Sequence, residues 1–444
     1  MNCGNVTIQM YTNRCVMVTG ENTMHGINNG LQTLIDKAVF EATEKNTIRV
    51  WCGLHQLDLA AQKGYQAISG GNFLEVLRPL ISHLRKQYKL RSKMDTQCPQ
   101  VATTRWLSMS KVLTWLCDHM ITIREHLEEH ADCAPSTSWW ILAFSVREMC
   151  NMMAYTLIVL QGHKTLLVQQ SAGLESLMKN ISDLAGIKKV EDMPEGTDPA
   201  SIIVKEVDGN SNLYVVKLHI REGIIEHQFH ILAMWNILSD DEKDSIITTV
   251  GEFALILVTR INDICAQRTT LNKAKRLSNF PVLPSQLLKM QTNIFNNLLL
   301  EHEPKMDASG LSAAQVSQEF ITFKDDVRRS ESLQDAFKDR LTTSDATISQ
   351  SDTSNAVTED FDDFWKIIDG KYKSLQNFCA GLATTFANTA SVESDFSLIG
   401  MEMTDQRSSM TDFTMAAILQ TKQYDKLRFP DIRIASSSSD DSQS

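Results

Sequence analysis

The sequence predicts an α/β unit at the N-terminus, followed by a long and mostly helical region. Three observations predict this. Short β-branched segments alternate with helical segments up to about residue 70. Beyond that point apolar residues recur at helical spacing. One interruption, at residues 201–218, consists of two β-branched runs around Asp208-Gly209, which predicts a β-hairpin.

The first region, residues 1–71, begins with a strand near Cys15–Val18. A Gly-rich turn follows it, and then a helix over about residues 28–44. A second strand is expected at Thr47–Trp51, with a helix beginning around Leu57. Strands that alternate with helices are typical of an α/β unit.

The second region, residues 72–340, is expected to be mainly helical, with the hairpin inside it. Leu77, Leu80 and Leu84 follow helical spacing, and residues 138–169 and 241–275 are long enough for substantial helices.

The remaining sequence consists of three segments that differ in composition. Residues 341–359 are rich in Ser, Thr and Asp, which predicts a polar linker. An apolar stripe then recurs through residues 360–430. The last stretch, residues 431–444, is mostly Ser and Asp, cannot bury an apolar face, and is expected to be disordered.

Composition limits the partners and the compartment. The 444 residues carry a formal net charge of −11. Because phosphate contacts need clustered positive charge, this balance argues against nucleic-acid binding over the whole surface. DNA association is therefore expected to be weak and local, with residues 83–93 as the most basic stretch, although a solvated helix end explains that stretch as well. Nine irregularly spaced cysteines, with neither a signal peptide nor a membrane span, favour the nucleus or, alternatively, the cytoplasm.

Three stretches, taken in order, give the strongest functional indication. Residues 50–60 read Val-Trp-Cys-Gly-Leu-His-Gln-Leu-Asp-Leu-Ala, residues 102–107 read Ala-Thr-Thr-Arg-Trp-Leu, and residues 390–400 read Ala-Ser-Val-Glu-Ser-Asp-Phe-Ser-Leu-Ile-Gly. In their order and in the long gap before the last, they resemble the motifs of the hAT superfamily of DNA transposases. The resemblance implies a partial RNase H-like core, with its first strands missing, interrupted by a large helical insertion domain.

Active members of that family hold Mg²⁺ with two Asp and one Glu, because hard cations need carboxylate oxygens. By resemblance the Glu is Glu393, whereas Thr19 stands at the position of the second Asp. A neutral hydroxyl cannot replace that ligand, and the first Asp and the zinc-finger segment of the family would precede residue 1. We therefore expect Glu393 to be vestigial and the chain to hold no metal and perform no strand cleavage.

The resemblance also assigns architectural or DNA-contacting roles to Cys52, His55, Arg105 and Trp106. It implies a homodimer formed through the C-terminal region. The residues expected at that interface are apolar or aromatic: Trp365, Tyr372, Phe378, Phe386, Phe396, Ile418 and Leu419. A stripe of this kind is more often typical of a core than of an interface.

Two histidine-containing segments have metal-ligand spacing. His126 and His130 stand one helical turn apart, with Cys117, His119 and Cys133 nearby in the sequence. Because a structural zinc site needs four convergent ligands, a surface helix is the favoured interpretation. His227 and His230 receive the same interpretation.

Two hypotheses follow from these observations. The first is a transposase-derived, catalytically inactive protein that self-associates through its C-terminal region. The alternative is a transposase whose metal ligands are completed elsewhere, with Glu21, Asp36 or Asp58 as candidates within the chain. A degraded fragment without selected function is a third possibility.

Overall fold

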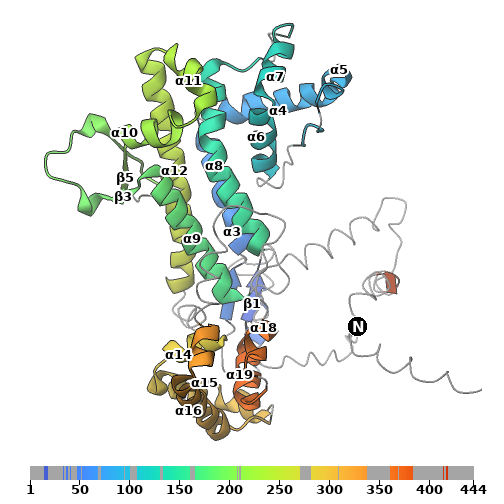
Figure 1. The fold of residues 1–444 in the computed structure, drawn as a ribbon, viewed down its shortest axis with the longest axis vertical. Helices are drawn as coiled ribbons and strands as arrows, with labels where there is room; N and C mark the ends of the chain where they lie inside the picture. The colour runs from blue at the N-terminus through green and yellow to red at the C-terminus, as the bar shows by residue number, and fades with distance from the viewer. Residues whose placement is uncertain are drawn as a thin grey trace, which may run out of the picture. The chain divides into compact units, whose positions relative to one another are not determined.

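A computed structural model describes residues 15–18, 34, 37–38, 41, 48–51, 53–68, 72–94, 96–100, 108–130, 134–160, 166–207, 209, 212–270, 282–308, 310–337, 361–368, 370–383, 414 and 417–418. Most of these residues are helical (Figure 1). This agrees with the expected mixture of a small α/β part and a large helical part. By contacts the chain divides into two units, residues 1–388 and 389–444.

The expected N-terminal strands are present and parallel. β1 (Cys15–Val18) pairs with β2 (Ile48–Trp51), with Cys15 opposite Ile48 and Val18 opposite Trp51. α3 (Gly53–Ala67) begins two residues after β2 ends. A parallel pair followed by a helix is part of an α/β unit. An RNase H-like core needs more strands than these two, which form the one parallel sheet among the described residues.

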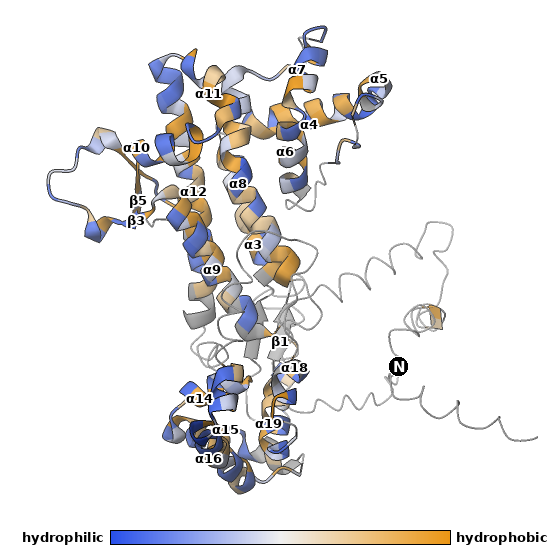
Figure 2. Cartoon of the chain, viewed as in Figure 1, coloured by the Kyte–Doolittle hydropathy of each residue, from blue (hydrophilic) through white to orange (hydrophobic). Residues whose placement is uncertain are grey.

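Helices α8 (Thr137–Leu160) and α12 (Asp240–Thr270) are long and pack together with α3 and α9 (Leu167–Ala185). The sequence of α8 is apolar almost all round, which is typical of a helix buried on most sides (Figure 2). At the start of α12, Ser239 and Glu242 form a capping box, which satisfies two backbone N–H groups.

Glycine permits the close approach of α3 and α12. A Cβ atom at Gly64 would lie 2.8 Å from Cε2 of Phe253, whose side chain is buried in α12. Tyr65 then donates a hydrogen bond to Sγ of Cys150 at 3.0 Å, which connects α3 to α8.

Shorter helices belong to the same region. They are α4 (Asn72–Lys86), α5 (Tyr88–Arg91), α6 (Ser108–Asp118), α7 (Met120–Leu127) and α11 (Phe229–Asn236). Among them, α6 and α11 pack directly against α8. The indole of Trp139 stacks on Phe73 and donates a hydrogen bond to its carbonyl at 3.2 Å, which attaches α4 to α8. Arg124 of α7 donates to the sulfur of Met234 in α11 at 2.9 Å.

The predicted hairpin is confirmed and has a third strand. β4 (Ile202–Val204) pairs antiparallel with β5 (Leu213–Val216), and β5 also pairs with β3 (Lys188–Lys189). Three short helical turns flank this sheet: η3 (Val190–Asp192), η4 (Pro199–Ser201) and α10 (Lys217–Ile220), the last continued by η5 (Arg221–Ile225).

A second apolar core joins helices on both sides of the expected linker. It contains side chains from α14 (Pro284–Lys289), α15 (Thr292–Ala308), α16 (Ala313–Arg329), α18 (Phe361–Lys366) and α19 (Lys373–Ala383). The sequence places a domain boundary at residues 341–359, yet residues 282–337 and 361–382 share this core. The linker itself and the tail at residues 431–444 lie outside the described residues.

Candidate functional site

Most residues that the resemblance assigns lie outside the described part of the chain. These are Thr19, Cys52, Arg105, Trp106, Phe386, Glu393, Phe396 and Leu419, together with Glu21 and Asp36 of the alternative hypothesis. His55 is described and is half-buried in the first turn of α3, which fits a role at the strand-to-helix junction. Asp58, one turn further along α3, is also half-buried.

The expected interface aromatics occupy a core. Trp365, Tyr372 and Phe378 are 2%, 4% and 4% exposed. Trp365 donates its indole N–H to the carbonyl of Val282 at 3.1 Å, and Phe378 meets Phe295 edge to face. These side chains therefore stabilise the chain from within and offer little surface to a partner. Ile418, by contrast, is a half-buried helical residue of the second unit.

Polar side chains join α16 to the start of α19. Asp326 accepts hydrogen bonds from Lys371 and from the hydroxyl of Tyr372. These two hydrogen bonds, that of Lys371 first, hold the pKa of Asp326 below its usual value. Burial, followed by the contact with Asp326, raises the pKa of Tyr372. All three groups are engaged in holding helices together.

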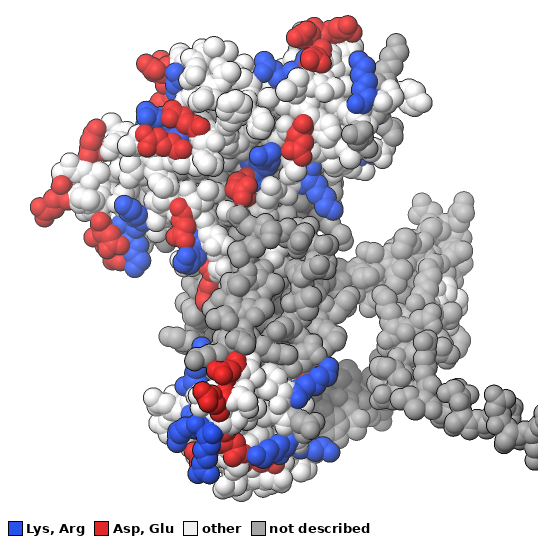
Figure 3. Space-filling view, in the orientation of Figure 1, with Lys and Arg blue, Asp and Glu red and all other residues white. Residues whose placement is uncertain are grey.

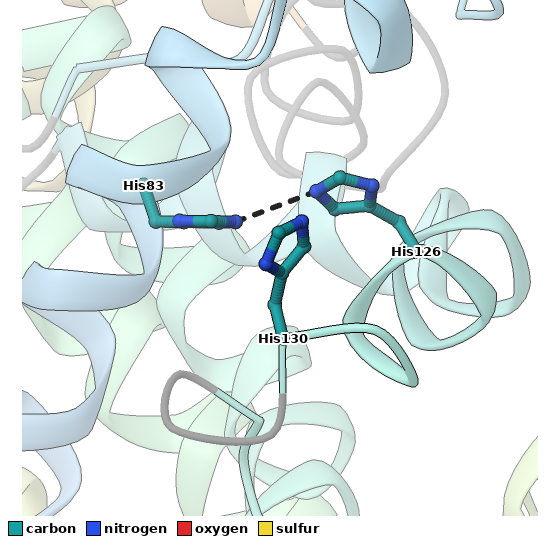
Figure 4. A group of neighbouring side chains, drawn as sticks. All are labelled: His83, His126 and His130. Atoms are coloured by element: carbon teal, nitrogen blue, oxygen red, sulfur yellow. Dashed lines mark hydrogen bonds between the residues drawn. The ribbon is translucent and has the colours of Figure 1, made fainter.

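Three histidines converge on one another from two helices (Figure 4). His83 lies in the last turn of α4, His126 in the last turn of α7, and His130 three residues after α7 ends. One ring nitrogen from each lies within 4.8 Å of those of the other two. Within the described part of the chain, no other group of three or more His, Cys, Asp or Glu side chains converges in this way.

Local sequence explains how the rings meet. The buried stripe of α4 includes Leu80 and Leu84, and His83 sits beside it. In α7, Ile123 and Leu127 are buried, so that His126 occupies the edge of the buried face. His83 and His126 are half-buried and His130 is exposed.

The surroundings favour the neutral form of two of the rings. Partial burial is the main reason that the pKa values of His83 and His126 are lowered, and proximity to His130 adds to it. Lys86 lowers the pKa of His83 further; Lys93 lowers that of His126, whereas Glu129 raises it. A neutral imidazole has a lone pair available for a metal ion.

The other predicted ligands do not join this group. Cys117 is buried, and burial raises its pKa to about 12, which disfavours the thiolate that binds metal. The ring of His119 stacks on that of Trp115, and its Nδ1 is hydrogen-bonded to the carbonyl oxygen of Trp115. Cys133 lies outside the described residues.

Sequence reasoning missed His83 because it is 43 residues from His126. The one signal in the sequence is its position in the basic stretch 83–93, and a charged segment does not by itself indicate a metal ligand. His227 and His230 are both exposed, and His230 contacts Phe229 edge to face.

A hollow of about 790 Å³ lies among α9, β3, β5 and α12. Its polar lining includes Lys179 and Lys189, which are paired with Asp183 and Glu191. Lys188 lines the hollow as well, but nothing in this lining indicates a particular ligand.

The sequence matches no protein-family model and no characterised protein. No helix among the described residues is both long and apolar enough to cross a membrane.

Proposed function

We propose that this chain is a transposase-related protein that acts by association rather than by DNA cleavage, and that it forms a homodimer through residues 389–444. The proposal rests on the three hAT-like stretches, with Thr19 at the position of a metal-binding Asp. The parallel strands β1 and β2, followed by α3, are compatible with one part of an RNase H-like core. A nuclear location follows from the same resemblance.

The division of the chain after Asn388 supports the choice of residues 389–444 as the associating segment. The second unit has 56 residues (444 − 388), of which the last ten are the polar stretch 435–444. Association with a second copy is a common way for a chain to bury apolar surface. Its apolar residues include Phe396, Ile418 and Leu419.

The burial of the aromatic residues of α18 and α19 also favours residues 389–444. Because Trp365, Tyr372 and Phe378 fill the core of residues 282–383, they contribute to dimerisation only by supporting that core. A truncation after residue 359 would remove α18 and α19 and open this core. The informative truncation therefore ends at Asn388.

The test is the molar mass of the full chain and of residues 1–388, measured by light scattering. We expect a dimer for the full chain and a monomer for the truncation, with circular dichroism reporting retained helices. In the full chain, Ile418→Asp should also weaken the dimer, because it places a charge at a half-buried position. Thr414→Asp, at an exposed position of the same unit, is the matched control.

Two results would contradict the proposal. A full chain that is monomeric throughout the accessible concentration range removes self-association altogether. A dimer that persists in residues 1–388 moves the interface into the first unit.

Local DNA association is the minor part of the proposal, and it rests on residues 83–93. Tyr88 is 81% exposed there, close in sequence to exposed Lys86 and Lys93, and exposed aromatics can stack on bases. On the face drawn in Figure 3, acidic and basic side chains are interspersed, which suits a local contact better than a broad one. Fluorescence anisotropy with a DNA duplex should show weak, salt-sensitive binding that Tyr88→Ala reduces.

The transposase alternative predicts Mg²⁺-dependent nicking of duplex DNA by the full chain. Nicking that disappears in Glu393→Gln would establish that alternative and overturn the non-catalytic proposal.

A further inference from the structure

The three histidines have a geometry that a metal ion would explain. Nε2 of His83 and Nε2 of His126 are 3.4 Å apart. Two Zn–N bonds of about 2.0–2.1 Å at the tetrahedral angle separate their nitrogens by about 3.3–3.4 Å. The distance between these two nitrogens therefore matches one edge of a tetrahedral zinc site.

A hydrogen bond between the rings is the simpler explanation, and it accounts for less. Its length would exceed the usual range of about 2.7–3.2 Å for N–H donors. It would also involve only His83 and His126, whereas His130 approaches both of them, with ring centroids at 5.0 Å from His83 and 4.9 Å from His126. Convergence of three rings is what a common ligand requires.

The ring orientations also favour a shared ligand over stacking. The planes of His83 and His130 are inclined at 62°, and those of His126 and His130 at 50°. Figure 4 shows the three rings turned toward a common space between α4 and the end of α7. Inclined rings can direct one lone pair each toward a single point.

We propose that His83, His126 and His130 together bind one divalent transition-metal ion, with Zn²⁺ as the ion that best fits. Imidazole nitrogen is a good ligand for Zn²⁺, Cu²⁺ and Ni²⁺, and is poorly suited to Mg²⁺ or Ca²⁺. Among the described residues three side chains converge, and His130 is exposed, so a water molecule can complete the coordination at the fourth position. This inference does not depend on the proposed dimer.

Binding would connect α4 to the end of α7. The two helices contribute ligands that are far apart in sequence, so a bound ion would act as a cross-link between them. Lys86 and Lys93 oppose the charge of the ion and Glu129 favours it. The net effect of these charges predicts an affinity below that of a closed four-ligand zinc site.

The experiment uses the full chain, freed of metal with a chelator, and measures Zn²⁺ affinity by competition with a chromophoric chelator. We expect one Zn²⁺ ion to bind per chain. Loss of supporting hydrogen bonds around metal ligands already costs about 10–100-fold in affinity, so loss of a ligand should cost on the order of 100-fold. The test variants are His126→Gln and His130→Gln, and His230→Gln is the control at an exposed histidine.

His130→Gln keeps the test decisive if His126→Gln fails to fold, because His130 is exposed and its replacement leaves the packing intact. Two further readouts separate this site from binding at cysteines. Zn²⁺ should raise the thermal unfolding temperature of the wild type and of His230→Gln but not that of His130→Gln. Co²⁺ should give a visible spectrum without thiolate charge-transfer bands.

Equal Zn²⁺ affinity in the wild type and in His130→Gln would overturn the proposal. So would a Co²⁺ spectrum dominated by thiolate bands, which would assign the binding to cysteine residues.

Discussion

Two helical regions of the described chain, residues 53–270 and 282–383, are stabilised in different ways. The first relies on long apolar helices: α8 has 24 residues and α12 has 31. In the second no helix exceeds 17 residues among those described. Its aromatic core is supplemented by polar contacts, such as that of Asp326 with Lys371 and Tyr372.

Both regions also contain polar contacts. In the second region the ionisable side chains of Asp326 and Glu319 already hold α16 to α19, since Glu319 accepts from the backbone N–H of Leu375 at 2.8 Å. In the first region apolar packing of long helices is also supplemented by polar contacts, such as that of Ser110 with Asn151. Its three histidines lie at the edge of the buried stripes of α4 and α7 and face one another.

The largest effect that tests this comparison is expected from Trp365→Ala. The indole is 2% exposed and donates to the carbonyl of Val282. Its removal leaves a cavity and an unpaired carbonyl, and should cost about 3–5 kcal/mol of unfolding free energy. Urea unfolding followed by circular dichroism would measure this loss.

Lys373→Ala, an exposed position in α19, is the control and should change little. If Trp365→Ala lowers the stability no more than Lys373→Ala does, the second region has no core that depends on its aromatics. The two regions would then not differ in the way they are stabilised.

Sequence periodicity was sufficient for elements whose signals are local. Asp208-Gly209 between β-branched runs predicts the observed hairpin, and the apolar residues 138–169 predict a substantial helix, of which α8 covers the part up to Leu160. β3 was missed because Lys188-Lys189 has no strand pattern, and its pairing comes from the neighbouring β5.

The sequence singles out two of the three histidines but favours a surface helix there. His126 and His130 are spaced as on one helical turn, yet α7 ends at Leu127, before His130. His83 joins them only through the packing of α4 beside α7, and such long-range packing leaves no pattern in a single sequence. The burial of Trp365 and Tyr372 depends in the same way on helices that precede the linker.

An intermediate effect is expected from Gly64→Ala in the first region. The new Cβ would meet the buried ring of Phe253 at 2.8 Å, and overpacking of this kind costs about 1–3 kcal/mol. Gly381→Ala in α19 is the matched change in the second region, where the new Cβ would meet no other described element within 4 Å.

Because alanine favours a helix over glycine, Gly381→Ala should leave stability unchanged or raise it by about 0.5–1 kcal/mol. The opposite signs would be measured as shifts of the urea midpoint in opposite directions. A loss at Gly381 equal to that at Gly64 would mean that the two regions are packed equally closely.

The smallest effect is expected from the pH dependence of the polar contacts in the second region. The pKa of Asp326 is held below its usual value in the folded chain, so its contribution is complete above the pKa of the unfolded state, about 4. That contribution is lost as pH falls through the folded pKa. Asp326→Asn should therefore flatten the acid side of the stability profile, and Asp325→Asn provides the same change of charge one residue away.

At alkaline pH the stability changes in the opposite direction, because there it is lost as pH rises. The pKa of Tyr372 is raised by burial and by Asp326, so its contribution is complete below the unfolded pKa of about 10 and is lost as pH rises through the folded pKa. Tyr372→Phe should therefore reduce the alkaline loss measured by urea unfolding and leave the acid side sloping. An unchanged profile in both Tyr372→Phe and Asp326→Asn would show that aromatic packing alone holds α19 to α16, as apolar packing holds the long helices of the first region.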